Sequence, residues 1–188
     1  GAAPAAGVRP RHDFARPAFD DLPGPLRPRR GNEPLPLWVA PISIASNNET
    51  AQIEGIPADD PNGTYGGSVA DDNSGVIRYV SIRHGGSNIG EGNEINGLTL
   101  GGVGSGTVVE YVEVVGNQDD GIEWFGGTVN VTHALVWYAG DDAIDTDQSW
   151  GGTLDNFIVI GAANQLFELD GPEGTMAATH VLKNGSVK

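Results

Sequence analysis

Two acidic segments carry the residues of this chain that are best suited to chemistry. Asn117–Gly127 reads NQDDGIEWFGG and Ala139–Gly152 reads AGDDAIDTDQSWGG, so an Asp-Asp pair recurs after 22 residues. Neighbouring carboxylates can serve as the acid and base of glycoside hydrolysis, and they are also the oxygen ligands that calcium takes. A single pair would fit a catalytic site, whereas two pairs at a fixed spacing indicate a repeated element that positions both.

The acidic pairs belong to a repeat that runs through the chain. Two sequence tracks recur at intervals of 22 to 24 residues: Asn96-Gly97-Leu98, Asp120-Gly121-Ile122, Asp142-Ala143-Ile144 and Asn164-Gln165-Leu166; and Thr132-His133, Asn156-Phe157 and Thr179-His180. Short β-branched runs such as GTVVEYVEVVGN lie between the turn residues, which is typical of strands. A period of this length with several strands per repeat predicts an all-β, right-handed parallel β-helix of about six coils over residues 42–188.

Stacked coils place like residues above one another, in columns. Leu98, Ile122, Ile144 and Leu166 are the predicted core column of one sheet, and Val112, Ala134 and Ile158 that of another. The Asp-Asp pairs then lie at one corner of successive coils, where Asp and Asn tolerate left-handed backbone and bond to their own main chain.

Residues 1–41 differ from the rest of the chain in composition. They hold six of the ten basic residues and nine of the twelve prolines, which predicts an irregular Pro/Arg-rich arm. Residues 42–188 carry 21 Asp and Glu against four basic residues, a balance of −17. A surface of this charge repels phosphate backbones and anionic lipids, so we expect no nucleic-acid partner and no membrane insertion; it favours cations or neutral glycans.

A resemblance to a known group is carried by residues 93–152, which include NGLTLGGVGSG and the two acidic segments. This stretch is similar to secreted right-handed parallel β-helix repeat proteins of Bacteroidota and related bacteria, which share the pectate-lyase-like fold. The resemblance extends over about residues 42–182. It implies a secreted, extracellular or outer-surface protein, and most members of the group have no established activity.

A more local resemblance concerns catalysis. NQDDGI is similar to the Asp-Asp motif of polygalacturonase-type hydrolases, but the His-Gly of this chain, His84-Gly85, lies upstream, and no Lys or Arg occurs between Arg83 and Lys183. A pectate-lyase-like reaction would also need a cationic residue beside the acids. We therefore expect a non-catalytic scaffold of the adhesive, matrix or binding type, with a polysaccharide-degrading enzyme as the alternative.

The acidic edge is the predicted metal site. Its six carboxylates, on neighbouring coils, are those of Asp119, Asp120, Asp141, Asp142, Asp145 and Asp147. Like charges about one strand spacing apart repel one another, and this repulsion is relieved either by backbone N–H groups at the turns or by a hard cation such as calcium. Glu123 and Trp150 are predicted ligand contacts: Glu123 should face outward with Asp145, and Trp150 should be exposed at a turn and could stack on a glycan.

The chain ends in THVLKNGSVK, in the middle of a strand track. A β-helix interrupted there would present unpaired N–H and C=O groups, which recruit another strand. We therefore expect a fragment that stacks on a second copy or is capped by a partner chain. Sedimentation should show association that increases with concentration, and a monodisperse monomer at high concentration would contradict this expectation.

Overall fold

The computed structural model describes residues 50–53, 56–87, 95–172 and 177–188. The predicted arm, residues 1–41, lies outside these ranges. In the part of the chain that the structure describes, no helix is long and apolar enough to cross a membrane.

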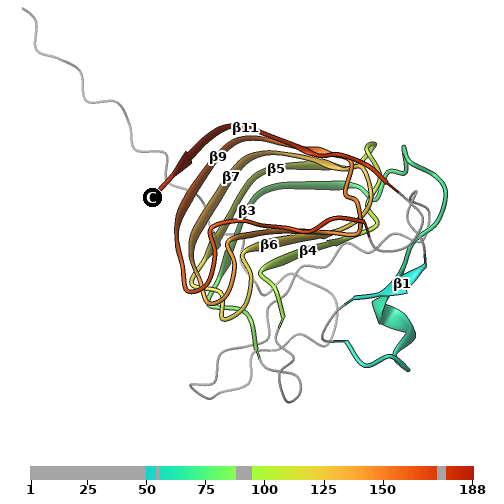
Figure 1. The fold of residues 1–188 in the computed structure, drawn as a ribbon, viewed down its shortest axis with the longest axis horizontal. Coiled ribbons are helices and arrows are strands. Elements are labelled where there is room, and N and C mark those ends of the chain that lie inside the picture. The colour runs from blue at the N-terminus through green and yellow to red at the C-terminus, as the bar shows by residue number, and fades with distance from the viewer. Residues whose placement is uncertain (1–49, 54–55, 88–94, 173–176) are drawn as a thin grey trace, which may run out of the picture. The chain divides into compact units, whose positions relative to one another are not determined.

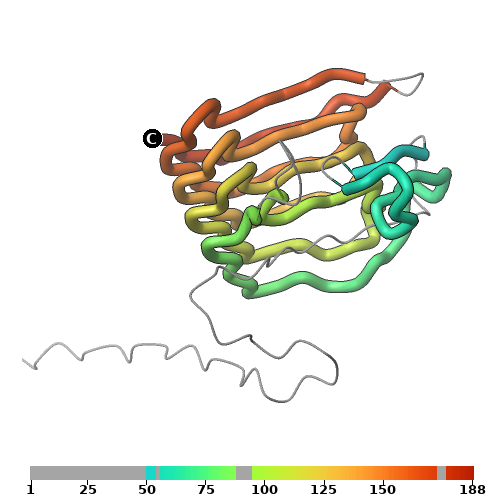
Figure 2. The backbone as a smooth tube through the Cα atoms, turned by 90° about the horizontal axis from the view of Figure 1, so that it is seen from below, coloured from blue at the N-terminus to red at the C-terminus, as the bar shows by residue number. Residues whose placement is uncertain are grey.

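Two parallel sheets build the body of the described chain (Figure 1). The first has the order β10-β8-β6-β4, and its strands are β4 (Leu98–Gly101), β6 (Ile122–Phe125), β8 (Ile144–Asp147) and β10 (Glu168–Leu169). The second has the order β11-β9-β7-β5-β3, and its strands are β3 (Val76–Arg83), β5 (Val108–Val115), β7 (Asn130–Ala139), β9 (Thr153–Ala162) and β11 (Val181–Val187). Because the chain alternates between the sheets, successive coils stack side by side, as Figure 2 shows, and the predicted parallel β-helix is confirmed.

The segment before β3 does not form a coil of the solenoid. β1 (Ala51–Gln52) and β2 (Thr64–Tyr65) pair antiparallel, with a short 3-10 turn, Pro61–Gly63, between them. Asp60 caps this turn by accepting a hydrogen bond from the backbone N–H of Asn62 at 2.9 Å. The prolines and the Asn-Gly pair favour a turn over a strand here. The described residues thus contain β3 followed by four coils, fewer than the six expected.

The core column of the first sheet is as predicted. Leu98, Ile122 and Ile144 pair in register and are fully buried. Leu166 precedes β10, is partly buried and packs against the same core.

The core column of the second sheet differs from the prediction at one position. Val112 aligns with Ala134, and Ala134 aligns with Phe157, which is 6 % exposed. Ile158 pairs instead with Leu135 on the outer face and is 48 % exposed. The true interval from β7 to β9 is 23 residues, not 24, and a shift of one residue turns a side chain to the other face.

A bend crosses the middle of all five long strands at the same level. It is formed by one residue per strand with φ between 55° and 62°: Tyr79, Tyr111, His133, Asn156 and Asn184. The rings of Tyr79, Tyr111 and His133 stack along this column, with centroid distances of 4.8 and 4.3 Å. The bend interrupts the alternation of inward and outward side chains along each strand. In β11 the bend residue is Asn184, and not a residue of the Thr179-His180 pair that the second sequence track placed there.

The two isoleucines offer a matched test of the register. Ile144→Ala leaves a cavity in a fully buried column and should lower the free energy of unfolding by about 2–5 kcal/mol. Ile158→Ala removes the same atoms from a half-exposed site and should cost less than about 1 kcal/mol. Urea denaturation of both variants measures the difference, and equal costs would contradict the register.

Candidate metal centre

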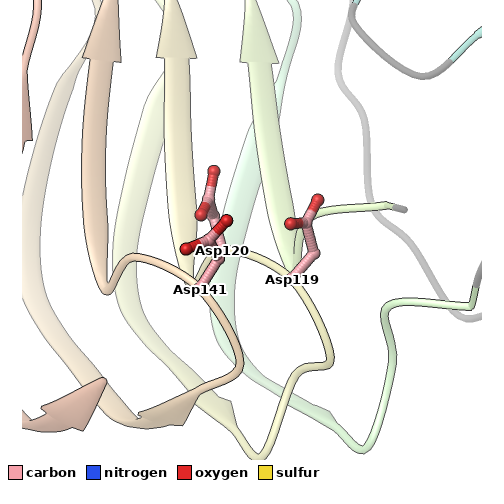
Figure 3. A group of neighbouring side chains, drawn as sticks. All are labelled: Asp119, Asp120 and Asp141. Atoms are coloured by element: carbon pink, nitrogen blue, oxygen red, sulfur yellow. The ribbon is translucent and has the colours of Figure 1, made fainter. Parts of the chain in front are cut away.

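The acidic pairs lie in two turns that stack one coil apart. Asp119 and Asp120 precede β6, and Asp141 and Asp142 precede β8. The backbone N–H of Gly121 donates to the carbonyl oxygen of Asp142 at 2.8 Å, which fixes one turn above the other. The prediction that both pairs occupy one corner of successive coils is therefore confirmed, and Figure 3 shows the carboxylates of Asp119, Asp120 and Asp141 gathered there.

Two groups of carboxylates in the described residues could hold a metal ion. Asp119, Asp120 and Asp141 form the first, and Asp120, Glu123 and Asp145 form the second. Within each group one oxygen per residue lies within 4.8 Å of the others. Asp120 belongs to both groups and is buried. The second group is the more enclosed, because Glu123 is buried as well, whereas Asp141 of the first group is exposed.

Backbone N–H groups satisfy part of this charge. One carboxylate oxygen of Asp120 accepts from the backbone N–H of Asp142 at 2.9 Å. One oxygen of Asp142 accepts from the backbone N–H of Gln165 at 2.5 Å. The alternative role, carboxylates that form the turns, therefore holds for these two residues, each of which has a second oxygen.

The side chain of Asn96 contacts the second group. This residue is 6 % exposed, and its side-chain amide N–H donates to the carboxylate of Glu123. Its carbonyl oxygen Oδ1 has no hydrogen-bond partner among the residues that the structure describes. A buried polar atom without a partner needs an explanation, and an amide oxygen is among the oxygen ligands that calcium takes.

Burial and neighbouring negative charges raise the pKa values of several carboxyl groups in this region. Burial raises the pKa of Asp120 to about 8, with further contributions from the charges of Asp119, Asp145 and Asp142. Burial also raises the pKa of Asp145 to about 7, together with the charges of Asp147, Asp142 and Asp170. The pKa of Glu168 rises to about 7, chiefly through its hydrogen bond with Asp142.

The outcome for the predicted ligands is mixed. Asp119, Asp120, Asp141 and Asp145 lie in the two groups described above, whereas Asp142 and Asp147 belong to neither. Asp142 is turned along the stack toward Gln165, and Asp147 aligns with Phe125 one coil away. Glu123 pairs in register with Asp145 as expected, but it is only 2 % exposed and belongs to the second carboxylate group.

The prediction of an exposed Trp150 is wrong. Its indole is 1 % exposed and stacks on the buried Trp124 at a centroid distance of 4.5 Å. Its Nε1 donates to the carbonyl oxygen of Val129 at 3.0 Å. Gly152 makes this possible, because a Cβ at that position would lie 2.5 Å from the indole nitrogen.

Two residues of the acidic region, Asn96 and Glu168, were not predicted as site residues, although both lie one coil period from a predicted site residue. Asn96 stands 24 residues before Asp120 on the first track, and Glu168 stands 23 residues after Asp145. Asn96 was treated only as a repeat position, and Glu168 was not considered. Carrying the carboxylate columns one coil further in each direction would have found them.

The match to known families agrees with this geometry. The family model described as a pectate-lyase like β-helix domain matches residues 42–185, which is most of the chain. The chain belongs to this family. No curated protein and no solved structure matched the chain. In this pectate-lyase-like domain, the acidic corner is thus a set of turn carboxylates with the donor chemistry of a hard-cation site.

The raised pKa values predict that stability falls with rising pH when no divalent cation is present. The folded state retains protons on Asp120 and Asp145 that the unfolded chain releases near its ordinary Asp pKa, so the free energy of unfolding should decrease from about pH 5 to about pH 8. Denaturation in EDTA across this range measures the slope. Asp145→Asn should flatten the slope and Asp59→Asn, at an exposed site outside both groups, should not; a flat wild-type curve would contradict the assignment.

Proposed function

We propose that this pectate-lyase-like β-helix domain is a non-catalytic scaffold that binds calcium at the group Asp120, Glu123 and Asp145. The observation that carries the proposal is the coincidence of three close carboxylates with the buried, unpartnered Oδ1 of Asn96. Together these side chains offer four oxygen donors, and water or main-chain carbonyl groups would complete the six to eight that calcium takes.

The donor set favours calcium over other metals. Both groups contain only carboxylates, and the sequence has no cysteine, so soft metals find no thiolate. Magnesium demands a near-ideal octahedron, whereas calcium accepts irregular oxygen cages. The proposed affinity for calcium is modest, because the protein supplies few ligands. It is higher at alkaline pH, because calcium must displace protons from Asp120 and Asp145.

The proposed location is the outside of the cell. The sequence resemblance is to secreted and surface proteins, and calcium sites with dissociation constants of about 0.1–1 mM are typical of extracellular modules. A reporter fusion that remains inside the cell when the full-length gene is expressed in its host would contradict this location.

A polysaccharide-degrading enzyme is the second candidate. Carboxyl groups that stay protonated near neutral pH beside ionised ones suit general acid catalysis, and Asp120 and Asp145 have this property. The sequence has no Lys or Arg between Arg83 and Lys183 to neutralise an acidic substrate, which supports the scaffold instead. Release of reducing ends or unsaturated products from acidic glycans, lost in Asp120→Asn, would favour the enzyme.

Calorimetry with calcium chloride at about pH 8.5, above the raised pKa values of both Asp120 and Asp145, tests the scaffold proposal directly. We expect saturable binding and a rise in melting temperature at millimolar calcium. Glu123→Gln and Asp145→Asn should each weaken binding by about tenfold or more, since each removes a charged ligand.

Two control variants locate the ion. Asp141→Asn belongs to the other carboxylate group and should have a smaller effect, and Asp59→Asn, exposed and outside both groups, should have none. No heat and no melting shift in the wild type, or equal losses in all four variants, would show that the carboxylates only form turns.

A further inference from the structure

The outer face of the second sheet carries a patch of exposed apolar side chains. Trp137 is 45 % exposed, Tyr138 is 64 % exposed and Ile158 is 48 % exposed. The register places Leu135 beside Ile158 and Trp137 beside Ile160, so that the side chains form one surface across β7 and β9. Contiguous exposed apolar surface on a protein rich in charge marks an interaction site more often than isolated residues do.

Trp137 and Tyr138 form the aromatic centre of this patch. Their ring centroids are 6.3 Å apart and the ring planes differ by 29°. On the neighbouring strands, Gly116 and Gly161 occupy the places beside Tyr138. A Cβ at Gly161 would lie 3.0 Å from the Tyr138 ring, so the ring rests over glycine backbone and no side chain in its own column stacks on it.

The other exposed aromatic residues of this sheet are arranged differently. Tyr79 is 67 % exposed and has φ 57°, close to the 64 % and 56° of Tyr138. The ring of Tyr79, however, stacks on Tyr111, which stacks in turn on His133. In that column each ring stacks on a ring of the neighbouring strand, whereas only glycine lies beside Tyr138 on the neighbouring strands.

The charges on this face are balanced. Its basic residues are paired with acids of the neighbouring strand: Arg78 with Glu110, Arg83 with Glu113, and Lys183 with Asp155. The chain as a whole carries −15, and the acidic groups described above lie at the first sheet and the turns that lead into it. A face with matched charges and open aromatic rings selects neither an anionic polymer nor a cation, and it fits an uncharged ligand.

We propose that Trp137 and Tyr138, with Leu135, Ile158 and Ile160 beside them, form a platform that binds an uncharged linear polysaccharide. The apolar C–H faces of sugar rings pack on aromatic rings, and sugar hydroxyl groups can bond to the tyrosine hydroxyl and to polar neighbours such as Glu113, which is in register with Leu135. A β-sheet surface suits an extended chain. This site is separate from the proposed calcium site and does not depend on it.

Native affinity electrophoresis in EDTA tests the platform, with hydroxyethyl cellulose, mixed-linkage β-glucan or galactomannan in the gel and polygalacturonate as the charged comparison. We expect at least one uncharged polymer to retard the protein. Trp137→Ala and Tyr138→Ala should each weaken retardation by about two- to tenfold, the effect of losing one aromatic contact. Tyr79→Ala is the matched control, and it should behave like the wild type.

A second measurement needs no change in the platform itself. Trp124 and Trp150 are buried, so in a Trp38→Phe background acrylamide quenching reports mainly Trp137. The retarding polymer should protect this fluorescence. The proposal is overturned by retardation in none of the uncharged polymers, by retardation in polygalacturonate alone, by equal loss in Tyr79→Ala, or by unprotected quenching in every polymer. Self-association that Trp137→Ala abolishes, without any polysaccharide effect, would assign the patch to a second copy of the chain.

Discussion

The structure depends on the in-register stacking of parallel strands, which brings each residue to about 4.8 Å from its counterpart in the next coil. Hydrogen bonds between the coils fix this register at the turns as well as in the strands, as the bond from Gly121 to Asp142 shows. When the same residue type recurs at the coil period, its side chains are therefore stacked on one another in successive coils. For Leu98, Ile122 and Ile144 this stacking is favourable, because it builds a continuous buried column.

For carboxylates the same constraint is unfavourable, and the acidic corner shows how the chain relieves it. Some of the charge is met by backbone N–H groups, as for Asp120 and Asp142. Some is removed by protonation, since burial and neighbouring charges raise the pKa of Asp120 and Asp145. A cation would replace those protons. At the proposed site, protons and calcium would compete for the same oxygens, and the preferred occupant would change with pH.

The sequence predicted those parts of the structure that a recurring motif marks. In the first sheet the core residue follows the same short turn motif in successive coils, as in Asp120-Gly121-Ile122, so the predictions of the core column and of the stacked Asp-Asp turns were correct. The second sheet has a left-handed residue inside every long strand, at Tyr111 and His133 for example, and this interrupts the alternation that sequence reasoning uses. The interval from β7 to β9 is also one residue shorter than the sequence tracks suggested, and this difference placed Ile158 inside the core, where Phe157 lies.

The errors at the site have a different physical origin. Alternation correctly gave the face to which Glu123 points, but alternation does not show whether that face is covered. Likewise, the position of Trp150 at a turn suggested that its indole is exposed. Gly152, two residues further on, leaves the space in which the indole packs inside. Burial at a turn depends on contacts between segments distant in sequence, such as Trp150 and Val129, and a period contains no information about these contacts.

Stacking also explains why the two faces of the solenoid can have different chemistry. Each coil contributes one residue to a column. Substituting the outward-facing residue at the same position of several coils therefore changes a whole column of the surface, while the core columns stay intact. In the first sheet the column that contains Glu123 and Asp145 is acidic and partly enclosed. In the second sheet the column beside Trp137 contains Gly116, Tyr138 and Gly161, and the ring of Tyr138 packs against the backbone at Gly161, where a Cβ would lie 3.0 Å from it. Gly161 has φ 73°, a conformation that strains most other residues, so the position that favours glycine also leaves space for the ring.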